Sequence, residues 1–368
     1  MRIQRILLAN FKGVREFCLD LSPTTTTSSG KLVALLGDNG SGKTTILQAI
    51  ALVLSLATRR TRHVEDFAWY GFLPERISSM GRTLVELTVL LDPEEVEATN
   101  QLYRAWYDSL SSEWRDTHRI VEPSAETTLT LTYEAGRVDS SHGMAGVNQF
   151  LGRYYVKQLG KSQPQYRANY AKVGDVFWFD QHRNLGGVMR NGSGDEIKRL
   201  SPPEDSWQVG VEQLREYLVG WWGYHTSPDK SRGRDYIPVL EESFNRVFPD
   251  VRFRGIQPKE TAEVARASDF YFLLEQRGKV YDIAEMSSGE QAVFPLTYEF
   301  ARLDIAKSVV LVDELELHLH PPQQQALLAA LPKLGPDCQF LVTTHSPYLE
   351  GIIPAENEVR LKGGRRCL

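Results

Sequence analysis

A glycine-rich segment near the start of the chain has the residue types and spacing of a phosphate-binding loop. Gly37–Thr44 matches the pattern G-x-x-x-x-G-K-[ST] and stands between an apolar run at 32–36, which predicts a buried strand, and a stretch with helical apolar spacing. Glycines let backbone N–H groups surround a phosphate, and the helix start adds a positive dipole. We expect Lys43 to bind the β- and γ-phosphates of a nucleotide and the Thr44 hydroxyl to bind Mg²⁺. The predicted phosphate-binding residues are Asn39, Gly40, Ser41, Gly42, Lys43, Thr44 and Thr45.

Two acidic residues follow a second apolar run. The sequence VVLV at 309–312 predicts a strand buried in a parallel sheet, and Asp313 and Glu314 come directly after it. Ligands bind at the carboxyl ends of strands in open α/β sheets. We expect Asp313 to hold Mg²⁺ and Glu314 to act as the general base that polarises the attacking water. An acidic strand-to-helix corner is the alternative, and the phosphate-binding loop in the same chain disfavours it.

The string Met286–Gln291 (MSSGEQ) has two interpretations. Taken alone, it is a helix start in which a serine is the cap and Glu290 lies in the first turn. It is also similar to the LSGGQ signature of the ATP-binding-cassette (ABC) superfamily, and closer to the LSSGE form found in the RecF and SMC branch. The spacing from Gly289 to Asp313 resembles that of the superfamily.

Three further strings resemble the same branch. Thr343–Pro347 (TTHSP) follows an expected strand at 339–342 and is similar to the switch-histidine motif, with His345 as the histidine. Asp313–Pro321 (DELELHLHP) resembles the DExExxLHP form of RecF-like and OLD-like ATPases, and Leu7–Gly13 (LLANFKG) resembles the opening strand and turn. Together the motifs resemble an ABC-class ATPase of the RecF/SMC-like branch, an AAA family ATPase similar to OLD-like and Septu-like heads.

This resemblance implies a head-to-tail homodimer, or a higher oligomer, with ATP and Mg²⁺ enclosed in the interface. The phosphate-binding loop of one copy would face the signature of the other, so that Ser287, Ser288 and Gly289 bind the γ-phosphate in trans. The resemblance makes Lys43, Glu314 and His345 the catalytic set. Gln181, just after an expected strand at 176–179, is the candidate for the residue that senses Mg²⁺ and the attacking water, and a polar loop residue is the alternative.

The predicted fold class is α/β: an ABC ATPase head, or P-loop NTPase, with a mixed sheet core, an antiparallel β-subdomain and a helical lobe with inserts. We expect a discontinuous ATPase core at 1–91 and 265–368, and an inserted helical and loop-rich region at 92–264 that includes elements of the second lobe. Glycine, serine and proline predict loops at Ser140–Arg153 and Asn184–Asp205. The sequence predicts neither a long coiled-coil arm nor a C-terminal Toprim nuclease domain.

Composition excludes several classes of protein. The chain has 368 residues, of which 42% are hydrophobic and 24% charged, and a net charge of −5. These values argue against general disorder and against a surface that is basic throughout. Cys18, Cys338 and Cys367 lack metal-ligand or disulfide spacing, which predicts a reduced cytoplasmic protein. No apolar run approaches the roughly 20 residues that span a bilayer, so no membrane partner is expected.

Two other groups of residues have functional alternatives. Glu314, Glu316, His318 and His320 would share one face of an extended segment and include metal-ligating types, but the alternating leucines fit a half-buried segment equally well, with His318 near a dimer interface. The basic runs Thr58–His63 and Gly363–Arg366 could bind nucleic-acid phosphates, although a solvated surface is favoured.

The sequence therefore favours a dimeric ATP-hydrolysing switch. Analogy with short, armless heads of the same branch suggests a component of prokaryotic anti-phage defence that controls a separate nuclease or toxin effector. A RecF-like DNA-repair ATPase that clamps duplex DNA is one alternative, and a nucleotide-bound scaffold with little turnover is another.

Overall fold

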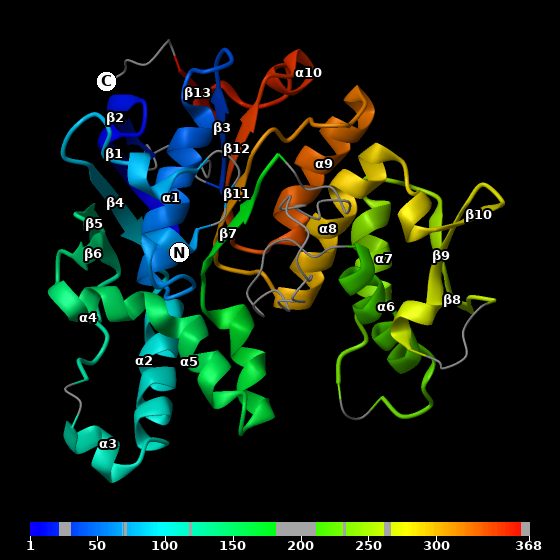
Figure 1. Cartoon of the computed structure of the whole chain (residues 1–368), viewed down its shortest axis with the longest axis horizontal. Helices are drawn as coiled ribbons and strands as arrows, with labels where there is room; N and C mark the ends of the chain where they lie inside the picture. Colours follow the sequence, from blue (N-terminus) through cyan, green and yellow to red (C-terminus); the bar gives the residue numbers. More distant parts are fainter. Residues whose placement is uncertain are drawn as a thin grey trace, which may run out of the picture. The chain divides into compact units, whose positions relative to one another are not determined.

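The computed structural model (Figure 1) describes residues 1–21, 31–67, 69, 72–117, 120–181, 211–230, 233–260 and 266–361. The predicted loop at Asn184–Asp205, the basic run Gly363–Arg366 and Cys367 lie outside these residues. The chain divides into two compact units, which are described separately. The first consists of Met1–Trp178, Ile305–Leu315 and Gly335–Leu368, and the second of Phe179–Asp304 and Glu316–Leu334. The first unit therefore includes residues 92–178, which the sequence analysis assigned to the insert at 92–264.

The first unit contains an antiparallel sheet with the strand order β2-β1-β4-β5-β6. Side chains alternate between the two faces of each strand, and in β4 the residues Val85, Leu87 and Val89 are fully buried while their neighbours are half-buried. This sheet is the predicted antiparallel subdomain. Its strands are β1 (Arg2–Phe11), β2 (Val14–Asp20), β4 (Leu84–Leu90), β5 (Thr128–Glu134) and β6 (Arg137–Ser140).

A second sheet in the first unit has the order β13-β3-β12-β11-β7. The pairs β13–β3, β3–β12 and β12–β11 are parallel, so the carboxyl ends of these strands lie at one edge. The central strands are buried on both faces, as their uninterrupted apolar runs predicted. The strands are β3 (Leu32–Leu36), β7 (Val176–Phe179), β11 (Val309–Val312), β12 (Gln339–Thr344) and β13 (Glu358–Arg360).

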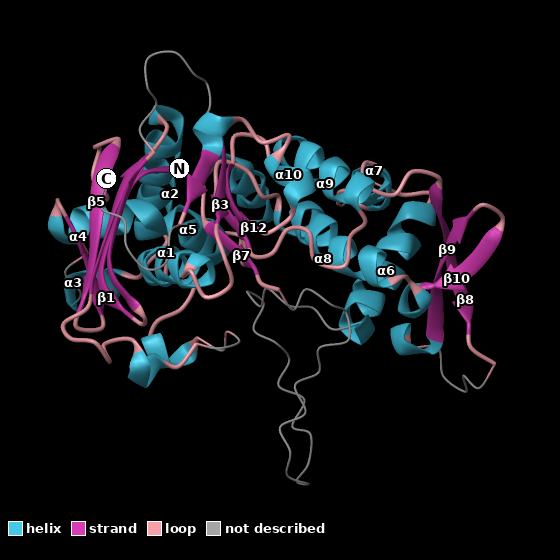
Figure 2. Cartoon of the chain, turned by 90° about the horizontal axis from the view of Figure 1, so that it is seen from above, coloured by secondary structure: helices cyan, strands magenta, loops and turns pink. Residues whose placement is uncertain are grey.

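Helix α1 lies between the two sheets, as Figure 2 shows, and packs against β1, β4 and β5 on one side and β12 on the other. Its apolar residues are buried on every face of the helix. The packing of α1 therefore also fixes the position of the loop that precedes it. The α-helices of the first unit are α1 (Lys43–Ala57), α2 (Pro93–Asp108), α3 (Ser112–Thr117), α4 (Gly143–Asn148), α5 (Gly152–Leu159) and α10 (Pro347–Glu350). Short 3₁₀ helices are η2 (Val64–Asp66), η3 (Pro74–Arg76), η4 (Gln149–Leu151), η5 (Pro164–Lys172) and η8 (Ala355–Asn357).

The predicted loop at Ser140–Arg153 is wrong, because α4, η4 and the start of α5 occupy it. Two of its glycines, Gly146 and Gly152, are packing positions and not turn positions. A Cβ on Gly146 would lie 2.0 Å from Ser140 Oγ, and one on Gly152 would lie 2.8 Å from the Cβ of Val173. The absence of a side chain at these positions allows neighbouring residues to approach closely within a helical segment. The glycine content alone had predicted a loop there.

A buried ion pair joins the segment after α1 to the start of β7. The Arg60 guanidinium lies 2.8 Å from Asp175 Oδ2, and both side chains are 8% exposed. The guanidinium groups of Arg60 and Arg153 lie 4.7 and 5.1 Å from the centre of the Phe177 ring. Burial lowers the pKa of Arg153, and the Asp175 carboxylate opposes that change.

Replacing Asp175 by asparagine is expected to destabilise the protein by about 3–5 kcal/mol, because it leaves buried arginine charge uncompensated. The exposed pair Lys31–Asp337, with side chains 46% and 51% exposed, supplies the control. Lys31→Ala should cost less than about 1 kcal/mol. Urea unfolding, monitored by tryptophan fluorescence, measures the free energy of unfolding of both variants. Equally small losses in the two variants would mean that the buried pair contributes little to stability.

The second unit contains a sheet with the order β10-β9-β8, and helices α6 and α7 pack against it. Strands β9 and β10 form a hairpin around Arg277-Gly278, with Gln276 opposite Lys279. Helix α6 ends at Thr226. The elements are α6 (Val211–Thr226), α7 (Ile237–Asn245), β8 (Val251–Pro258), η6 (Ala267–Asp269), β9 (Phe270–Gln276), β10 (Lys279–Asp282), η7 (Ile283–Glu285), α8 (Ser288–Leu303) and α9 (Pro321–Leu334). Within the described ranges, no helix has the length and apolarity needed to cross a lipid bilayer.

Candidate nucleotide-binding site

The segment Gly37–Thr44 connects β3 to α1, as predicted. Gly40 and Gly42 have φ angles of 77° and 95°, a backbone region that favours glycine. The Lys43 ammonium is buried and donates hydrogen bonds to the carbonyl oxygens of Gly37 (2.8 Å) and Asp38 (3.1 Å). The loop therefore curls around the lysine head group.

The loop has the properties of an anion site. The first turn of α1 carries no acidic residue, so its positive dipole end is uncompensated by a side chain. Among the described residues, the buried hydroxyl of Ser41 has no hydrogen-bond partner. An ammonium, a hydroxyl without a partner and a helix N-terminus fit the β- and γ-phosphates of a nucleotide.

Thr44 and Asp313 lie side by side although the chain separates them widely. The Thr44 hydroxyl donates to the carboxylate of Asp313 at 2.9 and 3.1 Å, and Thr343 Oγ1 donates to Oδ1 of the same carboxylate at 2.6 Å. Asp313 is 1% exposed. A hydroxyl oxygen beside a buried carboxylate is the donor set that Mg²⁺ prefers, so these residues fit the ion.

Glu314 is held in an uncommon backbone conformation. Its φ angle is 47°, and its N–H donates to Thr343 Oγ1 at 2.7 Å. A non-glycine residue with positive φ costs free energy and persists only where its surroundings hold it. Thr343 therefore orients both acidic residues. Sequence reasoning placed Thr343 in the histidine motif but gave it no role.

His345 follows β12 and is exposed. In the parallel register Thr344 pairs with Leu36 and Val342 with Val312. Three groups therefore lie at one edge of the sheet, each directly after one of three adjacent strands: the phosphate-binding loop, the acidic pair and His345. Gln181 follows β7 and belongs to the second unit, so its role as an Mg²⁺ sensor stays a prediction.

The signature segment begins α8 in the second unit, where Ser287 is the N-cap. The Ser287 N–H and hydroxyl donate to Glu290 Oε2 at 2.8 and 2.7 Å, and the Tyr281 hydroxyl donates to Glu290 Oε1 at 2.6 Å. Burial and the adjacent Glu290 carboxylate raise the pKa of Tyr281, which keeps this donor protonated. The helix-start interpretation is thus correct for the local structure. Ser287 and Ser288 nonetheless remain exposed at the positive end of α8.

Gly289 is required by a close approach within the second unit, because a Cβ there would lie 3.0 Å from the carbonyl oxygen of His318. His318 itself is exposed and has a φ angle of 63°. The structure contains no group of three or more His, Cys, Asp or Glu side chains placed to hold a metal, within the residues it describes. Glu314, Glu316, His318 and His320 therefore form no such group among the described residues.

Comparisons with known proteins agree with this geometry. Residues 1–134 match the family model "AAA ATPase domain", and residues 228–349 match "AAA domain, putative AbiEii toxin, Type IV TA system". The chain is 21% identical to the retron Vc95 probable ATPase of Vibrio cholerae serotype O1 biovar El Tor, over 97% of this chain and 72% of that protein. It is also 21% identical to the Septu protein PtuA of Bacillus mycoides (strain KBAB4), over 99% of this chain but only 41% of PtuA.

Among solved structures, an SMC head bound to the C-terminal winged-helix domain of ScpA has the same fold, with a TM-score of 0.50 and 14% identity over 99% of this chain and 95% of that one. The chain thus resembles AAA ATPase domains and the ATPases of retron and Septu systems. The α/β fold, with its mixed sheets and helices, is like that of the SMC head, as predicted.

Proposed function

We propose that this protein binds ATP with Mg²⁺ and hydrolyses it in a dimer, as a switch that controls a partner. The observation that carries the proposal is the convergence of three segments at one sheet edge: the loop around Lys43, the acidic pair Asp313-Glu314 and His345. The Thr44–Asp313 hydrogen bond ties the first two segments together.

In the proposed mechanism, the Lys43 ammonium leaves the carbonyl oxygens of its loop and binds the β- and γ-phosphates. Thr44 and Asp313 would hold Mg²⁺, which when bound neutralises phosphate charge. Glu314 polarises the attacking water and accepts its proton, and Thr343 holds the Glu314 backbone in place for this. The exposed His345 follows β12, the strand next to β11, and is proposed to contact the γ-phosphate.

The signature of a second copy is proposed to complete the pocket. Ser287 and Ser288 are exposed at the start of α8, where the helix dipole favours an anion. A γ-phosphate bound by the loop of one copy and the serines of the other links the two, and its loss on hydrolysis removes the link. Such an interface is isologous and two-fold.

The retron and Septu relatives support a role in anti-phage defence, in which the dimer controls a separate effector such as a nuclease or toxin. The test is co-purification of the native complex from the source cell, followed by effector assays with ATP and with ADP. We expect a bound effector whose activity depends on the nucleotide. Purification without a partner, together with hydrolysis that duplex DNA stimulates strongly, would favour the RecF-like repair function instead.

The proposed dimer makes the specific rate of hydrolysis depend on protein concentration. We expect the rate per molecule to rise with concentration through the dimerisation range, because a single copy has an incomplete pocket. Phosphate release measured over a hundredfold range of concentration tests this. A rate per molecule that stays constant down to clearly monomeric concentrations would contradict the shared pocket.

Thr343→Val is expected to lower kcat for ATP by about 5- to 150-fold, equivalent to about 1–3 kcal/mol, with little change in KM. Valine has the shape of threonine but neither donates to Asp313 nor accepts from the N–H of Glu314. Thr343→Ser keeps the hydroxyl and should restore most of the rate. Steady-state kinetics measure both variants, and a serine variant as slow as the valine variant would show that the hydroxyl is not what matters.

A further inference from the structure

One segment of the first unit is free of acidic residues. Residues 140–174 contain no aspartate or glutamate, although the chain has 47 acidic residues and a net charge of −5. The same segment has five basic residues: Arg153, Lys157, Lys161, Arg167 and Lys172. Charge is therefore segregated within an acidic protein, and the segment that carries the positive charge forms α5 and η5.

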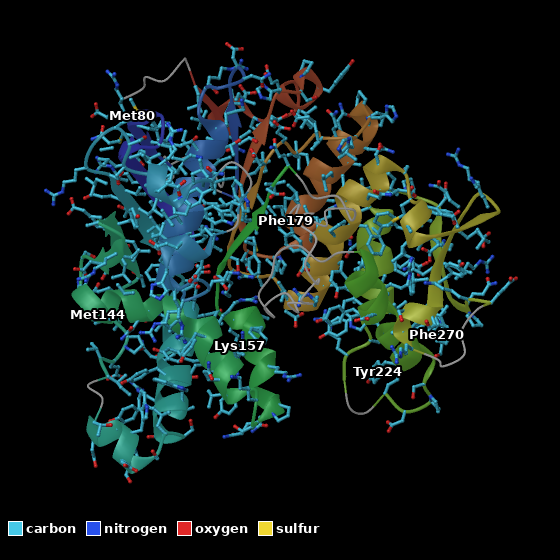
Figure 3. The ribbon with its side chains drawn as sticks, viewed as in Figure 1. Met80, Met144, Lys157, Phe179, Tyr224 and Phe270 are labelled. Carbon is cyan, nitrogen blue, oxygen red and sulfur yellow. The ribbon has the colours of Figure 1, made fainter. Side chains whose placement is uncertain are left out.

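Four of these five basic side chains reach solvent. Lys161, Arg167 and Lys172 are exposed and Lys157, labelled on α5 in Figure 3, is half-buried. Arg153 is buried, where it donates to the carbonyl oxygens of Val173 and Tyr170. The end of α5 and η5 are in direct contact, because a Cβ on Gly160 would lie 3.3 Å from Arg167 Cγ. The two elements that carry these basic residues, α5 and η5, therefore pack against each other.

Arg59 extends this region to the end of α1. Its guanidinium lies 5.8 Å from the centre of the Tyr154 ring on α5, and the residue is exposed. The adjacent Arg60 is committed to the buried ion pair with Asp175. Within the basic run Thr58–His63 that the sequence singled out, the structure therefore directs Arg59 toward α5.

Aromatic rings alternate with the basic residues. Tyr154, Tyr166 and Tyr170 are half-buried, so each ring is fixed in the protein while part of it faces solvent. Tyr154 packs against Tyr155 and Trp106, and Tyr166 and Tyr170 pack against the apolar cluster between α2 and α5. We call the set Arg59, Lys157, Lys161, Arg167, Lys172, Tyr154, Tyr166 and Tyr170 the basic face.

We propose that the basic face binds single-stranded nucleic acid. Lysine and arginine neutralise backbone phosphates and release counterions, and partly exposed tyrosine rings offer surfaces on which unpaired bases stack. Helix α5 has only eight residues, which is short for a helix that reads a duplex groove. No large apolar side chain between 150 and 172 is exposed in the described structure, so the face lacks the apolar anchors of a membrane-binding surface.

The binding of a fluorescein-labelled 30-nucleotide oligo(dT) and of oligo(U), measured by anisotropy without ATP, tests this site independently of hydrolysis. For Lys161→Gln combined with Lys172→Gln we expect at least about tenfold weaker binding and a salt slope reduced by about 1.4, or 0.7 per phosphate contact. Lys279→Gln combined with Lys333→Gln, at two exposed positions of the second unit, is the matched control and should bind as wild type does.

Tyr166→Ala separates stacking from charge, since it should weaken binding about five- to tenfold without changing the salt slope. A 30-base-pair duplex should bind more weakly than the single strands. The proposal is overturned if the wild type does not bind, if the lysine pairs of both units lose affinity equally, or if duplex or phosphatidylserine vesicles bind more tightly than the single strands.

Discussion

Replacing Glu314 by glutamine should lower the rate of ATP hydrolysis by about 10²–10⁴-fold while leaving ATP binding intact. Glutamine keeps the size of the side chain, and the backbone hydrogen bond from residue 314 to Thr343 does not depend on the carboxylate. What is lost is the negative charge that polarises the attacking water. Phosphate release under single-turnover conditions measures the rate, and equilibrium binding of a fluorescent ATP analogue measures the affinity.

Glu356→Gln is the matched control, because Glu356 is an exposed acidic residue of the same unit away from the sheet edge. It should hydrolyse ATP at the wild-type rate. If Glu314→Gln also hydrolyses at the wild-type rate, Glu314 is not the general base. If it fails to bind ATP, the residue acts in binding and not in the chemical step.

Lys43→Ala is expected to weaken ATP binding by about 10²–10³-fold, equivalent to about 3–4 kcal/mol. The Lys43 ammonium lies inside the loop, held by two carbonyl oxygens that release it to the phosphates. Its removal takes away a charged donor for two phosphates and leaves those carbonyl oxygens near the bound anion. Alanine favours helix, so α1 should remain folded. Isothermal titration with MgATP measures the affinity.

Lys31→Ala removes an exposed lysine of the same unit and should bind MgATP with unchanged affinity. This pair of variants separates a specific phosphate contact from a general loss of positive charge. Wild-type affinity in Lys43→Ala would place the nucleotide elsewhere in the molecule and would overturn the candidate site.

The strands that support the site could be predicted because each is a short, fully apolar run followed at once by polar residues. Strands were predicted on this ground at 32–36, 309–312 and 339–342, the last beginning with Gln339, and all three lie in the same sheet. The position of Asp313 near Thr44 followed from the same pattern, because the residues that follow parallel strands of one sheet lie at one edge, and only β12 separates β3 from β11.

Other features depended on tertiary register and packing, which local sequence does not encode. The contact between Thr343 and Asp313 exists because β11 and β12 pair with Val312 opposite Val342. The helices α4 and α5 were not predicted, because Gly146 and Gly152 serve close packing and not turns. The signature string was ambiguous for a physical reason: Ser287 both caps α8 and stands at the dipole end that would bind an anion.

Burial also determines the protonation state of Cys338. Burial raises the pKa of the Cys338 thiol to about 11, so it stays protonated at neutral pH and is a poor nucleophile. Cys18 is partly exposed and forms no disulfide.

The central proposal is that two copies of this chain enclose each ATP. Sedimentation velocity of Glu314→Gln tests it most directly, because slow hydrolysis preserves bound ATP. We expect a monomer without nucleotide, a dimer with MgATP, and a monomer again when Ser287→Arg is added, since the long side chain fills the space where the γ-phosphate would bind. A Glu314→Gln/Ser287→Arg protein that dimerises with MgATP as fully as Glu314→Gln does would contradict the proposal.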